Sequence, residues 1–308
     1  MASYSVLASN GAIARRPFAD STVLFDYCAM TKPEVNFLIA ITTATAFFIG
    51  SPEALSVFPW IRLLHAVFGT VLVASGAATL NQWMEYRFDA EMRRTSRRPV
   101  AAGRIEPVNA RRFGTVLSVA GIVYLTVAAG PLASGLAAAT LLSYLFLYTP
   151  LKRRSPLCTA IGAIPGAVPP LIGWAAARGS LDSDAWVLSA IVFLWQFPHF
   201  MAIAWMYRDD YDRAGYVVLP RGRARARFVA LQTLLPLLAL LALSLFPLRA
   251  GEPSIFYVMG AVSLGLCFLH HGVRFARRRS GAAARQLLLA SIIYLPSLFV
   301  LMVLSGSR

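Results

Sequence analysis

Acidic residues are scarce in this chain. Its 308 residues include 14 Asp and Glu against 29 Lys and Arg, which gives a net charge of +15. Only 14% of the residues are charged and 57% are hydrophobic, a balance that no soluble domain could bury. The cysteines are also few and far apart, at Cys28, Cys158 and Cys267, which argues against a disulfide framework or a cysteine metal site. The four histidines are equally scattered.

Long apolar runs make up most of what is present. Each of nine segments is close to the length that crosses a bilayer as a helix. They lie near 34–50, 60–81, 110–129, 132–149, 157–177, 185–206, 228–247, 254–272 and 286–304. Residues 1–30 are mostly polar and lack the long apolar core of a signal peptide. We therefore expect an all-α polytopic membrane protein, in which a tail (1–30) precedes one transmembrane domain (31–308).

The basic residues are distributed unevenly between the predicted loops. All but four of the 29 fall in the tail and in every second loop, and the exceptions are Arg62, Arg178, Arg249 and Arg308. Because basic residues concentrate on the cytoplasmic side of membrane proteins, this predicts a cytoplasmic N-terminus and an external C-terminus. Topology thus accounts for the charge, and nucleic-acid binding is not expected.

The second apolar run is followed by the stretch in which polar and charged side chains suited to ligand binding are most concentrated. Asn81, Glu85 and Asp89 would stack on one face if the helix continues past Leu80. Carboxylate and amide oxygens suit Mg²⁺. Four arginines, whose guanidinium groups suit phosphate oxygens, follow within ten residues at Arg93, Arg94, Arg97 and Arg98. The pattern indicates a diphosphate held at the mouth of a lipid-facing cavity; the alternative is a solvated, self-paired helix end that anchors the chain.

Two other loops on the same predicted side carry related residues. Asp209, Asp210 and Asp212 follow the sixth apolar segment, four spans after Glu85 and Asp89. This spacing predicts two helical halves that present carboxylates to one cavity. Lys152, Arg153 and Arg154 open a third loop, where they would anchor the chain or reach a phosphate held between the acidic loops.

These residues resemble the UbiA-type intramembrane prenyltransferases from about Thr31 to Pro220. Asn81-x3-Glu85-x3-Asp89 is similar to that family's first motif, and its glutamate is typical of the haem-farnesylating subgroup. Other matching stretches are 89–103, Tyr148–Arg153, Gly162–Trp174, Pro198–Phe200 and 210–220. The second motif departs from a regular Asp-x3-Asp, which leaves the choice among its aspartates open; we favour Asp210, directly before Tyr211.

The resemblance implies a UbiA-type bundle in the bacterial cytoplasmic (inner) membrane, with a central cavity that opens near the cytoplasmic side. It implies farnesyl transfer from farnesyl diphosphate to a vinyl group of haem B, with water addition, giving haem O. Haem B is then a substrate and Mg²⁺ the cofactor. Membrane lipid surrounds the protein, and haem A synthase or terminal-oxidase assembly factors are the candidate partners downstream.

The resemblance also assigns roles to single residues. Asn81, Glu85, Asp89 and Asp210 are the predicted catalytic, metal-binding set, with Asp209 as a further candidate ligand. The predicted diphosphate ligands are Arg94, Arg98, Lys152 and Arg153. His199 is either a hydrogen-bonded core residue or a haem contact, and Arg208 pairs with a haem propionate or with Asp212. Two other functions stay open: a UbiA-type enzyme acting on an aromatic acid, quinone precursor or chlorin, and a secondary transporter with carboxylate ion sites.

Overall fold

The computed structural model describes residues 20–53, 55–246 and 254–305, so the first 19 residues of the predicted tail lie outside it. Throughout these ranges the regular structure is helical and contains no strand. The helices are α1 (Asp20–Met30), α2 (Pro33–Gly50), η1 (Leu55–Val57), α3 (Trp60–Asp89), α4 (Pro107–Ala128), α5 (Pro131–Leu142), η2 (Ser143–Tyr148), α6 (Thr149–Leu151), α7 (Cys158–Gly166), α8 (Pro169–Arg178), α9 (Ser183–Met206), α10 (Arg208–Arg213), α11 (Ala224–Leu243), α12 (Ile255–Arg278) and α13 (Gly281–Ser305).

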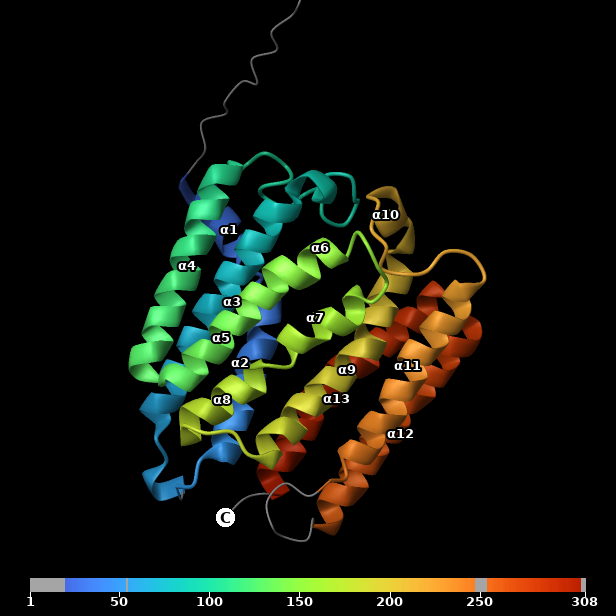
Figure 1. The fold of residues 1–308 in the computed structure, drawn as a ribbon. Coiled ribbons are helices and arrows are strands. Elements are labelled where there is room, and N and C mark those ends of the chain that lie inside the picture. Colours follow the sequence, from blue (N-terminus) through green and yellow to red (C-terminus); the bar gives the residue numbers. More distant parts are fainter. Residues whose placement is uncertain (1–19, 54, 247–253, 306–308) are drawn as a thin grey trace, which may run out of the picture.

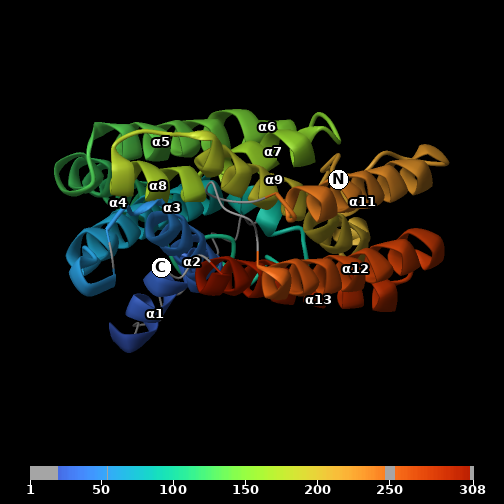
Figure 2. The same ribbon diagram turned by 90° about the horizontal axis from the view of Figure 1, so that it is seen from below.

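Within the described ranges, nine helical stretches are long and apolar enough to cross a membrane. They coincide with the nine predicted segments, which confirms a multi-pass all-α membrane protein. The second stretch is longer than its apolar run, because α3 continues as a helix to Asp89. Figures 1 and 2 show the stretches lying side by side in a bundle, with α1, α10 and the segment between α3 and α4 at one end.

Small residues allow α3 and α4 to pack closely. A Cβ atom added to Gly76 of α3 would lie 2.2 Å from Ser118 Oγ, and one added to Gly121 of α4 would lie 2.7 Å from Val73. Lipid offers no hydrophobic drive for helices to associate, so close backbone approach of this kind supplies van der Waals attraction instead. The pair forms a rigid wall that fixes where the polar end of α3 lies.

The fifth span is broken, as its run of glycines and prolines allows. α7 ends at Gly166 and α8 begins at Pro169. Two side chains of α9 bond carbonyls at the break: Ser189 Oγ donates to Ala167 O at 2.7 Å, and Gln196 Nε2 donates to Ala163 O at 3.1 Å. The span also packs closely on α2, because a Cβ on Gly173 would meet Thr43 O at 2.1 Å.

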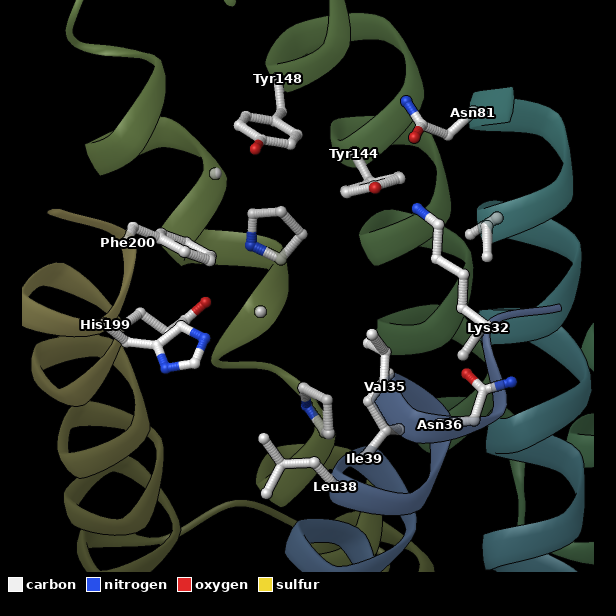
Figure 3. Close-up of a pocket in the computed structure, with 18 of the residues that line it drawn as sticks. Lys32, Val35, Asn36, Leu38, Ile39, Asn81, Tyr144, Tyr148, His199 and Phe200 are labelled. Atoms are coloured by element: carbon white, nitrogen blue, oxygen red, sulfur yellow. The ribbon is translucent and has the colours of Figure 1, made fainter. Parts of the chain in front are cut away.

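The fourth span changes from α-helical to π-helical geometry near its end. α5 passes into η2, a π-helical stretch that carries Tyr144 and Tyr148, and then into α6. Thr149 Oγ1 donates to Tyr144 O at 2.9 Å within this stretch. π-Helical turns inside membrane helices often mark functional sites, because the extra residue redirects side chains. Here both tyrosines point into the interior of the bundle (Figure 3).

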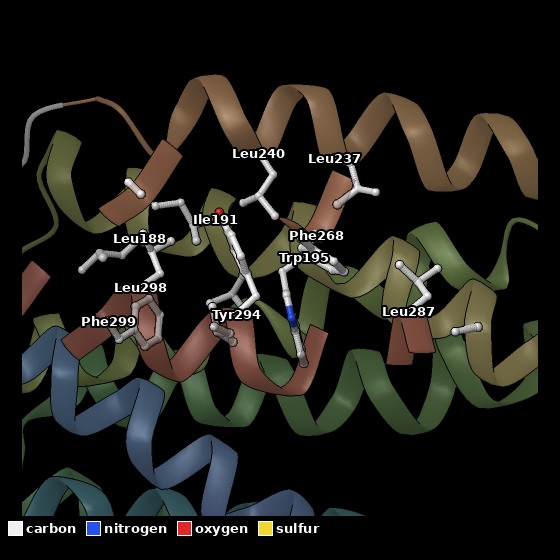
Figure 4. Packing of buried hydrophobic residues seen from close by; sticks show 14 of the residues in the cluster. Leu188, Ile191, Trp195, Leu237, Leu240, Phe268, Leu287, Tyr294, Leu298 and Phe299 are labelled. Carbon is white, nitrogen blue, oxygen red and sulfur yellow. The ribbon is translucent and has the colours of Figure 1, made fainter. Parts of the chain in front are cut away.

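The largest buried cluster joins α9 to α11, α12 and α13 (Figure 4). Trp195, Tyr294 and Phe299 are each at most 4% exposed within it. Trp195 Nε1 donates to Ser291 O at 2.7 Å and so ties α9 to α13. The cluster fixes α9 against α11 and α13, and it also includes Ala46 and Ile49 of α2.

The last residues of the predicted tail form α1, which packs onto the membrane domain. Val23, Tyr27 and Met30 contact apolar residues of the α3–α4 segment and of α4. Asp26, which is 5% exposed, accepts three hydrogen bonds of 2.9–3.1 Å from the Arg104 guanidinium. α1 therefore holds the arginine-rich segment between α3 and α4, a contact that the local sequence pattern does not reveal.

Candidate active site

A cavity of about 710 Å³ lies inside the bundle, a volume typical of small-molecule sites. Side chains of α2, α3, α5 with η2, α7, α9 and α13 line it, and most of them are apolar. Figure 3 shows Leu38 and Ile39 of α2 across from His199 and Phe200 of α9. The wall becomes charged where α3 ends. The cavity therefore suits a ligand with a long apolar body and a charged end.

α3 supplies three oxygen-bearing side chains to the charged end. Asn81, Glu85 and Asp89 line the cavity at intervals of one helical turn and are 1%, 5% and 1% exposed. The stacking predicted from their spacing is present because α3 continues to Asp89. Carboxylates this deeply buried require a cation as partner.

Each of the two carboxylates has a basic partner. Lys152 Nζ lies 3.0 Å and 2.9 Å from the Glu85 oxygens, and Asn81 Nδ2 donates to Glu85 Oε2 at 2.8 Å. Arg98 Nη1 donates to both oxygens of Asp89, at 2.9 Å and 2.8 Å. Burial by itself lowers the pKa of Lys152, but the Glu85 carboxylate outweighs it and raises that pKa well above its usual value. Lys152 is thus charged.

Basic groups outnumber acidic ones at this end. Lys32, Arg94, Arg98 and Lys152 line the cavity, against the three carboxylates of Glu34, Glu85 and Asp89. Lys32 directly precedes α2 in a left-handed conformation with φ 54°, which is uncommon for a residue with a side chain. Burial, and then the charges of Arg98 and Lys152, lower the pKa of Lys32 to about 7. The local surplus of positive charge favours a polyanion such as diphosphate.

The second acidic loop lies at the same end of the bundle. Asp210 of α10 accepts a hydrogen bond from Arg94 N at 3.2 Å and forms an ion pair with Arg213 at 3.2 Å. It is 8% exposed, but it is not among the residues that line the cavity. Asp209 is 78% exposed at its side chain and pairs with Arg208 at 3.6 Å. Of the neighbouring aspartates, Asp210 is the one that contacts the arginine segment.

The profile of the UbiA prenyltransferase family matches residues 39–295. The chain belongs to this family. A relative named protoheme IX farnesyltransferase, from Solibacter usitatus (strain Ellin6076), is 47% identical over 285 residues, covering 91% of this chain and 98% of that protein. A second protein of that name, from Sorangium cellulosum (strain So ce56), is 44% identical over 254 residues, covering 80% of this chain and 89% of that protein.

Solved UbiA-type structures share the fold. A structure of digeranylgeranylglyceryl phosphate synthase aligns with a TM-score of 0.72 and 15% identity, covering 92% of this chain and 98% of that one. A UbiA homolog from Archaeoglobus fulgidus, bound to GPP and Mg²⁺, aligns with a TM-score of 0.59 and 13% identity, covering 90% and 99%. Family and fold together favour a prenyltransferase over the transporter alternative.

The donor set of this UbiA protein fits a magnesium ion that is shared with a ligand. Within the described ranges, no group of three His, Cys, Asp or Glu side chains could hold a metal ion by itself. α3 offers the cavity two carboxylates and one amide, from Glu85, Asp89 and Asn81, all with hard oxygen donors. Mg²⁺ typically takes one or two protein carboxylates and completes its shell with water and substrate phosphates. The residues present therefore suit a metal bound together with a diphosphate.

Besides Asp210, three predicted ligands lie away from the cavity wall. Arg153, Arg208 and Asp209 are not among the residues that line it. The Arg153 guanidinium packs 4.0 Å above the Phe88 ring. Arg208 donates to Trp205 O at 2.9 Å and pairs with Asp209 rather than with Asp212. Arg94, Arg98, Lys152 and His199 do line the cavity.

Hydrogen bonding favours one tautomer of His199. Ser291 Oγ lies 2.6 Å from Leu288 O and 2.8 Å from His199 Nδ1, and with its one hydrogen donated to the carbonyl it accepts from Nδ1–H. The neutral ring then carries its free lone pair on Nε2. Because the imidazole projects into the cavity (Figure 3), this lone pair is available to a ligand.

Sequence reasoning missed several residues that line the cavity, namely Lys32, Tyr144, Tyr148, Tyr211 and Tyr216. Lys32 was counted only as a topological charge, although its place directly before the first span was a usable signal. Tyr144 and Tyr148 are spaced by one turn of a helix, but nothing local predicts the π-helical stretch that carries them.

Proposed function

We propose that this protein farnesylates haem B. The allylic carbon–oxygen bond of farnesyl diphosphate breaks, and the terminal vinyl carbon of haem B bonds to the farnesyl carbon. A water hydroxyl adds to the neighbouring vinyl carbon and the water's remaining proton is released. The products are haem O and diphosphate. Haem O then serves as a cofactor of haem–copper oxidases.

The observation that carries the proposal is identity over nearly the whole chain. Two relatives named protoheme IX farnesyltransferase are 47% and 44% identical to it, over 91% and 80% of this chain. The division of the cavity into a charged end and an apolar body supports the same reaction. Diphosphate matches the charged end, whereas an isoprenoid chain and a porphyrin match the apolar wall.

We assign the diphosphate to the basic groups at the end of α3. Lys152 and Arg98, which hold Glu85 and Asp89, lie where they can transfer their hydrogen bonds to phosphate oxygens. Asn81, Glu85 and Asp89, with Asp210 at the rim, are the proposed magnesium ligands. When bound, Mg²⁺ would neutralise the negative charge that grows on the leaving diphosphate. Preorganised donors in a site shielded from water stabilise that charge most effectively.

We assign the acceptor to the α9 side of the cavity. The His199 Nε2 lone pair is a suitable axial ligand for haem iron, and Ser291 fixes the ring through Nδ1. Trp195 lies 4.8 Å from the imidazole between ring centroids and limits its rotation. Arg208 lies off the cavity wall, so a role with a haem propionate would place that group at the rim.

Charge distribution supports an orientation in which the diphosphate end faces the cytoplasm. We propose that the protein lies in a bacterial inner membrane with its N-terminus inside, and that residues 31–308 act as one domain. The added farnesyl group makes haem O more apolar than haem B and suited to the membrane, so haem A synthase or terminal-oxidase assembly factors are its proposed recipients.

The deciding experiment offers purified protein farnesyl diphosphate and Mg²⁺ with either haem B or 4-hydroxybenzoate. We expect haem B to gain one farnesyl group and one hydroxyl by mass spectrometry, and 4-hydroxybenzoate to remain unchanged. Chelation of Mg²⁺ should stop the reaction and added Mg²⁺ should restore it. Prenylation of 4-hydroxybenzoate alone would assign the protein to another acceptor class.

A matched pair of variants tests the assigned carboxylates. Asp89→Asn removes a charge that lines the cavity, whereas Glu91→Gln removes one that is exposed two residues later. We expect the first to lose nearly all turnover and the second to retain it. Wild-type turnover by a well-expressed Asp89→Asn protein would remove the proposed metal role.

A further inference from the structure

Tyr216 places a hydroxyl at the charged end of the cavity without a hydrogen-bond partner. The side chain is 3% exposed and lines the cavity, and its Oη is buried with no partner in hydrogen-bonding geometry. The backbone turns at Gly215, whose φ of 71° suits glycine, and Tyr216 N then bonds Tyr211 O at 2.9 Å. This turn directs the ring back from the end of α10 into the bundle.

The ring is held firmly by its neighbours. Phe88 and Tyr211 pack edge-on against it, with ring centroids 6.1 Å and 5.9 Å away. Val217, the next residue, donates its N–H to Lys152 O at 2.7 Å, which ties this turn to the loop that carries Lys152. The hydroxyl is therefore preorganised beside the basic groups of the site.

The local chemistry makes this hydroxyl a donor in need of an acceptor. A phenol is protonated at neutral pH, so the Tyr216 hydroxyl has a hydrogen to donate. The Glu85 carboxylate is nearby, but no hydrogen bond of standard geometry joins it to the phenol, and both its oxygens already accept from Lys152. A buried polar group without a partner is costly, and native proteins rarely keep one unless a ligand completes it.

We propose that Tyr216 is a substrate-binding residue whose hydroxyl donates a hydrogen bond to an oxygen of the prenyl diphosphate. The inference rests on the function proposed above and adds a neutral donor to the basic groups already assigned there. An anionic oxygen is the acceptor that the surplus of positive charge would bring to this position. Hydrogen bonds to charged groups are among the stronger ones in proteins.

The test compares Tyr216→Phe with wild type for binding of farnesyl S-thiolodiphosphate, a slowly reacting analogue, by calorimetry in the presence of Mg²⁺. Affinity should fall about tenfold, equivalent to ~1.4 kcal/mol. Inhibition by inorganic pyrophosphate, which has no prenyl chain, should weaken by a similar factor. The melting temperature of the ligand-free protein should not fall.

Tyr294→Phe is the matched control. Tyr294 is 2% exposed and its Oη also lacks a hydrogen-bond partner, but it lies in the α9–α13 cluster and does not line the cavity. We expect this variant to bind both probes as wild type does.

Three results would overturn the proposal. One is an unchanged affinity of Tyr216→Phe for both probes, and another is an equal loss in Tyr294→Phe. The third is a loss for the analogue without one for pyrophosphate, which would place the defect in the apolar wall. In each case, wild-type turnover of haem B would leave the proposed function standing. A wild type that binds neither probe would overturn both proposals.

Discussion

Removing the Lys152 side chain should leave the buried Glu85 carboxylate without its basic partner. The Lys152 and Glu85 side chains are 14% and 7% exposed and their charged atoms lie 2.9 Å apart. After Lys152→Met, only the Asn81 amide would still bond the Glu85 carboxylate. Breaking a buried ion pair from one side costs ~3–5 kcal/mol. We expect the lower end of that range, because Lys152 borders a cavity that water can enter.

The double variant Lys152→Met/Glu85→Gln separates stability from catalysis. Removing both charges leaves no unpaired ion, so the melting temperature should return close to that of wild type, whereas each single variant should be less stable. Turnover should not return, because both side chains are assigned to the diphosphate site. Loss of one preorganised donor typically lowers kcat by about 100-fold or more.

Two measurements on purified protein decide the outcome. Thermal unfolding of the ligand-free protein gives the stability of all four members of the cycle, and haem B farnesylation gives their turnover. A double variant that is less stable than either single variant would refute the ion-pair reasoning. A double variant with nearly wild-type turnover would refute the assignment of the pair to the diphosphate.

Three further outcomes follow from the same site. Asp26→Asn weakens the tie between α1 and Arg104, so KM for farnesyl diphosphate should rise about fivefold, equivalent to ~1 kcal/mol, with little change in kcat in steady-state assays. Lys32 is charged below its pKa of about 7 and neutral above it, so affinity for the diphosphate should fall as pH rises through that value; binding titrations should show a flatter profile for Lys32→Arg. Ser291→Ala removes the acceptor for His199 Nδ1–H, so the absorption spectrum of bound haem should change while pyrophosphate inhibition should not.

The parts of the site that follow local rules were predictable from the sequence. The stack of Asn81, Glu85 and Asp89 depends only on helical spacing, and the nine spans depend only on length and apolarity. Among the described residues, nine helical stretches have the predicted length and apolarity, and all three of these side chains lie on the cavity wall. Their metal role stays a prediction.

Features that depend on contacts between distant segments were not predictable. The docking of α1 on the membrane domain depends on the hydrogen bonds between Asp26 and Arg104, which lie 78 positions apart in the sequence. Lys32 and Tyr216 line the same cavity although they lie far apart in the sequence, and no spacing rule connects them. Arg153 adjoins Lys152 in the chain but packs on Phe88, because neighbouring residues of a turn point in different directions.

The break between α7 and α8 limits how this cavity can be reshaped. A Cβ added to Gly166 would lie 2.0 Å from Gln196 Oε1, while the amide nitrogen of that glutamine donates to the buried carbonyl of Ala163. Replacing Gln196 with a smaller residue to admit a longer isoprenoid would leave that carbonyl without its hydrogen-bond donor in an apolar environment. Selection for a new chain length should therefore alter residues on α2 or α13 before it alters this wall.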